Sequence, residues 1–124
     1  MREFSVAQAV SVWRKLMPVH PARTGIPFHW ATGVVDATMA RSGTVAAYLA
    51  YYDVILVPSA YDSMFADDIY IPTICHELQH AAQRNRWGFA LYEFNKTFRR
   101  DMVEAEAVAE ERRVQLLLGV SVLA

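Results

Sequence analysis

The N-terminal segment has the periodicity of an amphipathic helix. Its apolar side chains recur every three or four residues from Val6 to Met17, which is the spacing that puts them on one helical face. Ser5 stands directly before this run and is a good N-cap, and Pro18 and Pro21 follow it. Proline cannot continue a helix. The pattern therefore predicts a first helix over residues 6–17.

The middle of the chain has the pattern of short strands. Val45–Tyr52 is rich in aliphatic and aromatic residues, and Val54–Val57 is a β-branched apolar run. Such runs favour strands, either as a hairpin that turns near Tyr52–Asp53 or as one bulged strand. A further strand is expected within Ile26–Val35, although residues 22–43 as a whole are weakly patterned. The polar stretch Pro58–Asp68 is expected to be a loop.

The C-terminal half is predicted to be helical. Pro72 fits the first turn of a helix, where its missing N–H costs nothing, and this helix would extend to about Arg86, before Gly88. A shorter helix is expected over Phe89–Phe98, and a long last helix over Arg99–Leu118 with Gly119 as its stop. A helix, a few strands and then helices indicate an α+β fold.

Composition places this chain among folded domains. It has 124 residues, of which 54% are hydrophobic and 20% charged, with a net charge of -1. These values predict one domain over residues 1–124 and argue against disorder. They also disfavour a nucleic-acid surface, which needs an excess of cations. The apolar tail Leu116–Ala124 suggests a homo-oligomer.

Cysteine content and hydropathy bear on the compartment. Cys75 is the only cysteine, so the chain has no disulfide framework, which favours a reducing compartment. The N-terminus lacks the unbroken apolar stretch of a signal peptide, and no run approaches the ~20 apolar residues that cross a bilayer. We therefore expect a cytoplasmic protein without a membrane partner.

One motif carries chemistry. Residues 76–80 read His-Glu-Leu-Gln-His within a predicted helix. His76 and His80 are four residues apart and so lie one turn apart on the same face, where both imidazoles can bind one Zn²⁺ ion. Glu77 directly follows the first ligand and is placed to act as general base toward a metal-activated water. The alternative is two ordinary helix histidines beside a solvent-facing glutamate.

The downstream helix makes the pattern more specific. Residues 104–107 read Glu-Ala-Glu-Ala, and His-Glu-x-x-His followed by a helix with Glu-x-Glu-Ala resembles the minimal gluzincin metallopeptidases. These include small phage and bacterial proteins similar to the SprT-like and ImmA-like groups. The resemblance covers roughly Val45–Glu111. It departs from the pattern at Val108, where related proteins often carry Asp or Asn, and no third His follows His80 as in metzincins.

The resemblance carries expectations about fold and activity. It implies a zincin-like fold: an N-terminal helix, a small sheet, the His-Glu-x-x-His helix and a C-terminal helix whose Glu completes a Zn²⁺ site. It also implies a zinc-dependent metallopeptidase that hydrolyses a peptide or protein substrate, with Glu77 as the base. We expect an extended substrate to pair with an edge of the strand Val54–Val57.

The third metal ligand is left open between two glutamates. Two helical residues differ by about 200° in direction, so Glu104 and Glu106 cannot both face the ion. The resemblance aligns Glu104 with the ligand. A helical wheel favours Glu106 instead, because Glu106 shares a face with Val103 and has Glu110 as a neighbour on that face.

Other candidates are given minor roles. Cys75 adjoins the motif but is expected to be a small buried residue. His20 and His29 could contribute to a site but are expected to be packing or surface residues, and nothing selects Tyr92 among several tyrosines as a group that stabilises a developing oxyanion. The second functional hypothesis is a non-catalytic or latent metal-binding regulatory or interaction protein on the same scaffold. A fourth protein ligand would indicate that case.

Overall fold

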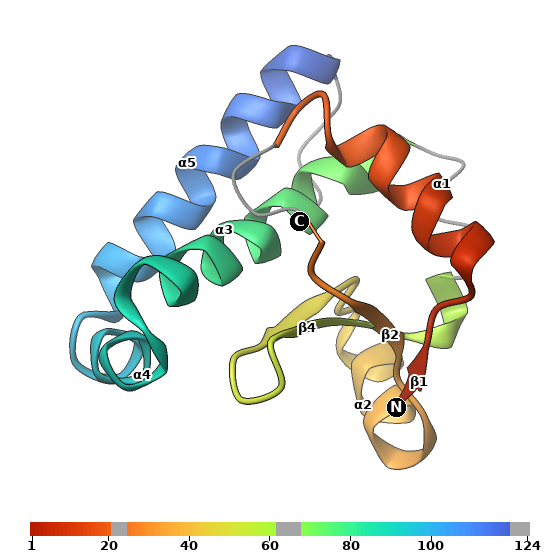
Figure 1. The fold of residues 1–124 in the computed structure, drawn as a ribbon, viewed down its shortest axis with the longest axis horizontal. Helices are drawn as coiled ribbons and strands as arrows, with labels where there is room; N and C mark the ends of the chain where they lie inside the picture. The colour runs from red at the N-terminus through yellow and green to blue at the C-terminus, as the bar shows by residue number, and fades with distance from the viewer. Residues whose placement is uncertain (21–24, 62–67, 120–124) are drawn as a thin grey trace.

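The computed structural model describes residues 1–20, 25–61 and 68–119, and within them an α+β fold (Figure 1). The elements in chain order are β1 (Arg2–Glu3), α1 (Val6–Leu16), β2 (Phe28–Trp30), α2 (Gly33–Ser42), β3 (Ala47–Leu49), β4 (Val54–Val57), the 3₁₀ turns η1 (Ser59–Tyr61) and η3 (Asp68–Tyr70), α3 (Ile71–Trp87), α4 (Phe89–Phe98) and α5 (Arg100–Leu118).

The four described strands form one mixed sheet in the order β1-β2-β4-β3. β4 pairs in parallel with β2 and antiparallel with β3, where Tyr48 lies opposite Ile55. The hairpin alternative is thereby confirmed, and Asp53 takes the left-handed conformation in its turn. Because both edges of β4 are paired, the expectation that a substrate pairs with Val54–Val57 is wrong. Among the described strands, β1 and β3 are the outer strands of this sheet.

Helices cover both faces of the sheet. On one face Leu56 packs with Met39 of α2. On the other face Ile55 and Val57 join the main core, which α1 and α3 complete with residues such as Leu16 and Ile74. All four residues of β4 are buried, as expected for a strand covered on both sides.

The C-terminal helices form a second layer beside the sheet. α3 and α5 lie side by side over much of their length, and α4 closes the end where they meet (Figure 1). Pro72 stands in the first turn of α3, as predicted. Gly88, with φ of 83° and ψ of 163°, separates α3 from α4, a conformation that residues with a Cβ rarely adopt. This turn lets α5 run back along α3, which brings two sequence-distant segments together.

The predicted helices α1, α3, α4 and α5 are all present within one or two residues of their expected bounds. The strand expected within Ile26–Val35 is the short β2, and residues 33–35 are instead helical. Helix α2 was not predicted because only one of its residues, Met39, is buried, so it has no apolar period. β1 was not predicted either.

Some expectations concern the chain's ends and surface. Leu116 and Leu117 of the apolar tail are exposed, whereas residues 120–124 of that tail and residues 62–67 of the predicted loop lie outside the described part of the chain. In the described ranges, none of the helices combines the length and apolar character that a bilayer crossing requires.

Candidate metal centre

Three side chains converge between α3 and α5. His76 and His80 lie one turn apart on α3, with their ring centroids 5.1 Å apart. Glu104 of α5 reaches both of them: its Oε2 lies 3.2 Å from His76 Nε2 and its Oε1 lies 3.2 Å from His80 Nε2. The three potential ligand atoms all lie within 4.8 Å of one another. The structure thus brings together the two motif histidines and one of the two candidate glutamates.

A second set of residues holds the far side of each imidazole. His76 Nδ1 lies 2.8 Å from Glu111 Oε1. His80 Nδ1 lies 3.0 Å from Gln83 Oε1, and Gln83 Nε2 donates to the carbonyl of Val103 at 3.0 Å. Both histidines are therefore oriented by hydrogen bonds within the protein, and Gln83 ties one of them to the residue just before Glu104.

These contacts determine which nitrogen of each ring carries the proton. The Val103 carbonyl can only accept, so the amide nitrogen of Gln83 must face it and the amide oxygen must face His80. An ionised Glu111 carboxylate can also only accept. Each Nδ1 is therefore the N–H, and in a neutral imidazole each Nε2 presents a lone pair toward Glu104.

When both imidazoles are neutral, the centre therefore brings three electron-pair donors together with no hydrogen-bond donor between them. Two imidazole nitrogens and a carboxylate face one another at hydrogen-bond distance, and in the neutral tautomers no proton lies between them. Such a set repels itself unless a cation, either a proton or a metal ion, lies among its members. Two imidazoles and one carboxylate are a donor set that suits Zn²⁺, so the residues present fit the ion that the motif predicts.

Glu77 lies beside this centre on the side of the sheet. Its Oε2 accepts a hydrogen bond from the backbone N–H of Tyr48 on β3, at 3.2 Å. Burial raises the pKa of Glu77 above its ordinary value, although the nearby His80 and His76 and the Tyr48 amide act in the opposite direction. A carboxyl group with a raised pKa next to a metal-ligand set suits acid–base chemistry.

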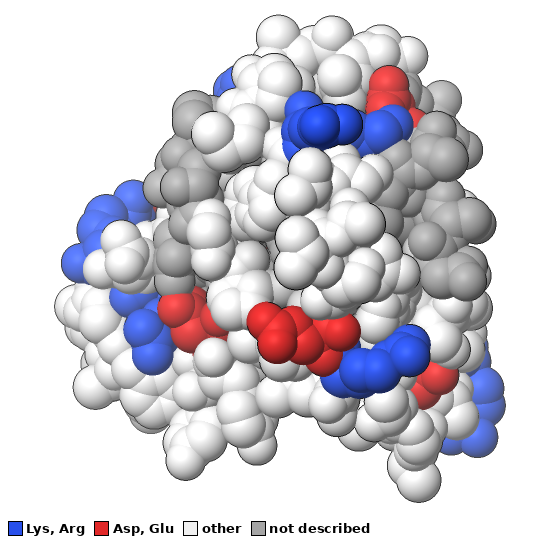
Figure 2. Space-filling view, turned by 45° about the vertical axis from the view of Figure 1, so that its right-hand side comes forward, with Lys and Arg blue, Asp and Glu red and all other residues white. Residues whose placement is uncertain are grey.

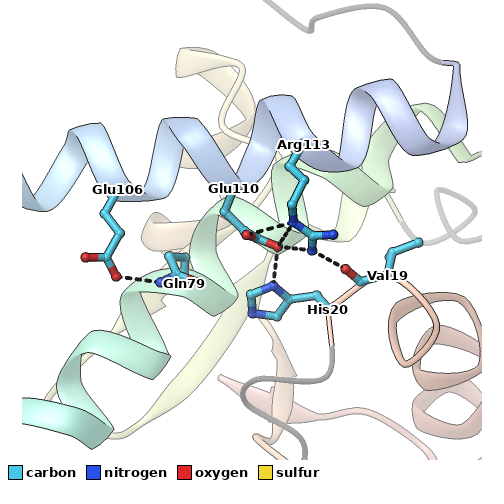
Figure 3. Close-up of polar contacts among 6 residues, drawn as sticks. All are labelled: Val19, His20, Gln79, Glu106, Glu110 and Arg113. Atoms are coloured by element: carbon cyan, nitrogen blue, oxygen red, sulfur yellow. Dashed lines mark hydrogen bonds and ion pairs between the residues drawn. The ribbon is translucent and has the colours of Figure 1, made fainter.

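The alternative ligand Glu106 points elsewhere (Figure 3). Its Oε1 accepts from Gln79 Nε2 at 2.5 Å, and Arg86 donates to its two oxygens at 3.2 and 3.1 Å. Partial burial tends to raise the pKa of Glu106, but the hydrogen bonds from Arg86 and Gln79 outweigh burial and lower it. The structure therefore places Glu104, and not Glu106, with the histidines.

Glu110, expected as a neighbour of a Glu106 ligand, belongs to a separate cluster (Figure 3). His20 Nδ1 lies 2.8 Å from Glu110 Oε1, and Arg113 donates to Glu110 and to the backbone carbonyl of Val19. His20 is 1% exposed. This cluster attaches the segment after α1 to α5, so His20 has the packing role expected of it.

The remaining candidates are also outside the ligand set. His29 lies in β2, away from the grouping of His76, His80 and Glu104. Cys75 is fully buried, and burial raises the pKa of its thiol to about 12, which confirms its reading as a small core residue.

The sequence assigned no role to Glu111 or Gln83. Glu111 follows Glu104 by seven residues, close to two helical turns, so helical spacing puts it on the same face as Glu104, but only the structure shows its contact with His76. Tyr92 of α4 is also near: its ring centroid lies 6.5 Å from that of His80. Burial, followed by the charges of Glu77 and Glu93, raises the pKa of Tyr92, so its hydroxyl stays protonated at neutral pH.

Comparison with known proteins identifies no family for this chain. The chain matches no protein-family model, no characterised protein and no solved structure. On the face drawn in Figure 2, acidic and basic side chains lie next to one another in small groups among uncharged ones. The local chemistry of the candidate metal centre is therefore the basis for assigning a function.

Proposed function

We propose that this protein is a zinc-dependent metallopeptidase in which His76, His80 and Glu104 hold the ion. The observation that carries the proposal is the convergence of two imidazole nitrogens and a carboxylate, with both rings oriented from behind. Among the described residues the grouping has three members. Catalytic zinc sites commonly use three protein ligands, whereas closed structural sites use four.

Zinc bound at these residues would supply a Lewis acid that polarises a carbonyl oxygen and makes water more acidic. The protein supplies the rest. Glu77 is the general base, since it follows a ligand directly and is held beside the site by the Tyr48 N–H. Its raised pKa suits a group that accepts a proton and later returns it to the leaving amine.

A peptide substrate is favoured by the neighbouring sheet edge. β3 pairs with β4 on one side and has no partner strand among the described residues on the other. The Tyr48 N–H on this outer edge donates to Glu77, which puts the edge next to the base. Extended peptides commonly add to such edges through main-chain hydrogen bonds, so β3, in place of the earlier expectation for β4, is the edge that we propose for substrate.

Metal analysis combined with a peptidase assay tests the proposal. We expect one zinc per chain and hydrolysis of a mixed peptide substrate. Glu77→Gln should retain zinc but lose roughly 10²-fold or more in kcat. Glu93→Gln is the matched control, because Glu93 lies on α4 and pairs with Lys96, and it should behave as wild type.

The outcomes separate the two functional hypotheses. A folded protein that binds no zinc would overturn the metal centre. Stoichiometric zinc without hydrolysis of any peptide would instead support the non-catalytic metal-binding protein. Equal activity of wild type and Glu77→Gln would remove Glu77 from the mechanism.

A further inference from the structure

A small pocket opens beside the proposed catalytic residues. It has a volume of about 230 Å³ and is lined by residues 43–46, Thr73, His76, Glu77 and Glu111. The pocket shares His76 and Glu77 with the proposed active centre. A peptide bound at that centre would therefore place a side chain next to the cleaved bond at the pocket. Sites for whole small molecules are usually about 300–1,000 Å³, so this volume suits a single side chain.

The charged groups in the pocket wall are acidic. Glu77 and Glu111 line it, and no Lys or Arg is among its lining residues. The Glu111 side chain is 17% exposed and accepts from His76 Nδ1 at 2.8 Å, which fixes its carboxylate in place. With Glu104 next to them, three carboxylates surround a site whose proposed ion carries two positive charges. Of these, Glu111 lines the pocket and is neither a proposed metal ligand nor the proposed base, so its carboxylate is the group placed to accept from a cationic side chain.

The uncharged part of the wall suits the stem of a long side chain. Val45 and Ala46 provide apolar surface, and Thr44 and Thr73 add hydroxyl-bearing side chains. Lysine and arginine bury their methylene stems against such surfaces while the charged head finds a polar partner. An acidic side chain in the same place would face like charges, which is unfavourable.

From these contacts we infer that the pocket binds a Lys or Arg side chain, and that the protein cleaves peptide bonds next to a cationic residue. The inference rests on the proposed peptidase function and adds a substrate class to it. Thr44, which lines the pocket and is not one of the proposed metal ligands, is a position where this preference can be changed.

Cleavage of defined peptides tests the inference. Cut sites are first located by mass spectrometry in a mixed peptide digest. One cleaved sequence is then made with Lys, norleucine or Glu at the position flanking the cut, and kcat/KM is measured for each. We expect Lys to exceed norleucine by roughly tenfold or more, the effect of one partly buried charged hydrogen bond, and Glu to be the poorest substrate.

Thr44→Lys places a cation in the pocket wall. It should therefore bring the ratio of kcat/KM for the Lys and norleucine peptides toward one. Thr38→Lys is the control, since it adds the same charge on the exposed side of α2 and should keep the preference. Salt gives a second measurement on the wild type. Raising ionic strength from about 0.1 M to about 1 M shortens the Debye length from about 10 Å to about 3 Å. This should lower the ratio of kcat/KM for the Lys peptide to that for the norleucine peptide.

The experiment distinguishes failure of the cationic pocket from failure of the proposed peptidase function. Cleavage with equal kcat/KM for Lys and norleucine peptides would overturn the cationic pocket and leave the peptidase intact. A zinc-loaded protein that cleaves no peptide would overturn the proposed function and this inference with it.

Discussion

Replacing Glu111 by Gln removes one negative charge from behind His76, a proposed metal ligand, while preserving shape. The substituted amide oxygen can still accept from Nδ1, so the variant separates charge from hydrogen bonding. In the native protein this contact is 2.8 Å long, and each of the two side chains is 17% exposed. A carboxylate in this position makes the imidazole a better electron donor toward a metal at Nε2.

The size of the effect follows from the contact. Hydrogen bonds to charged groups contribute about 1.5–3 kcal/mol at partly buried sites, and each 1.4 kcal/mol changes an equilibrium constant about tenfold. Losing the charge should therefore weaken zinc binding by roughly 10- to 100-fold, in the range typical for a residue that supports a ligand histidine. The affinity can be measured by competition with a chromophoric chelator at fixed pH.

Glu106→Gln is the matched control for this measurement. Glu106 lies on the same helix and loses the same charge, but it contacts Gln79 and Arg86 instead of a histidine. Its zinc affinity should stay within about twofold of wild type, as is usual for an exposed ion pair. Unchanged affinity in Glu111→Gln together with a large loss in Glu106→Gln would refute both the role of Glu111 and the assignment of Glu104 as ligand.

Three further predictions concern stability and reactivity. Gln83→Leu removes the hydrogen-bond acceptor of the buried His80 Nδ1 and the side-chain donor to the Val103 carbonyl, and should lower the free energy of unfolding by about 1–3 kcal/mol in urea titrations; an unchanged midpoint would contradict the network. Burial of Glu110 opposes ionisation, but hydrogen bonds from Arg113 and His20 outweigh it and lower its pKa from the ordinary 4.5. Its contribution to stability is therefore present above pH 4.5 and lost as pH falls through the lowered value. In thermal melts at acidic pH, the melting temperature of Glu110→Gln should therefore fall less steeply with decreasing pH than that of the wild type. The Cys75 thiol, with its pKa of about 12, should react with a disulfide reagent only after denaturation, and rapid labelling of the native protein would show that it is accessible.

Much of the helical framework could be predicted because its signals are local. Pro72 and Gly88 bound the motif helix, and a four-residue spacing on any α-helix brings His76 and His80 to one face. The sheet was less predictable. Strands of two to four residues carry little periodicity, and the position of β4 between β2 and β3 depends on pairing between segments distant in the chain.

The third ligand shows where local information ends. On α5 the buried residues Val103, Ala107 and Val114 form a stripe, and at about 100° per residue Glu104 and Glu106 project from opposite sides of it. Helical periodicity places both beside the contact with α3 but cannot say which side faces the histidines. The sequence by itself thus determined that His76 and His80 share one face of α3 with Glu77 beside them. Only the packing of α5 against α3 decided which glutamate joins the two histidines, since the rotation of one helix against another is set by contacts across the core.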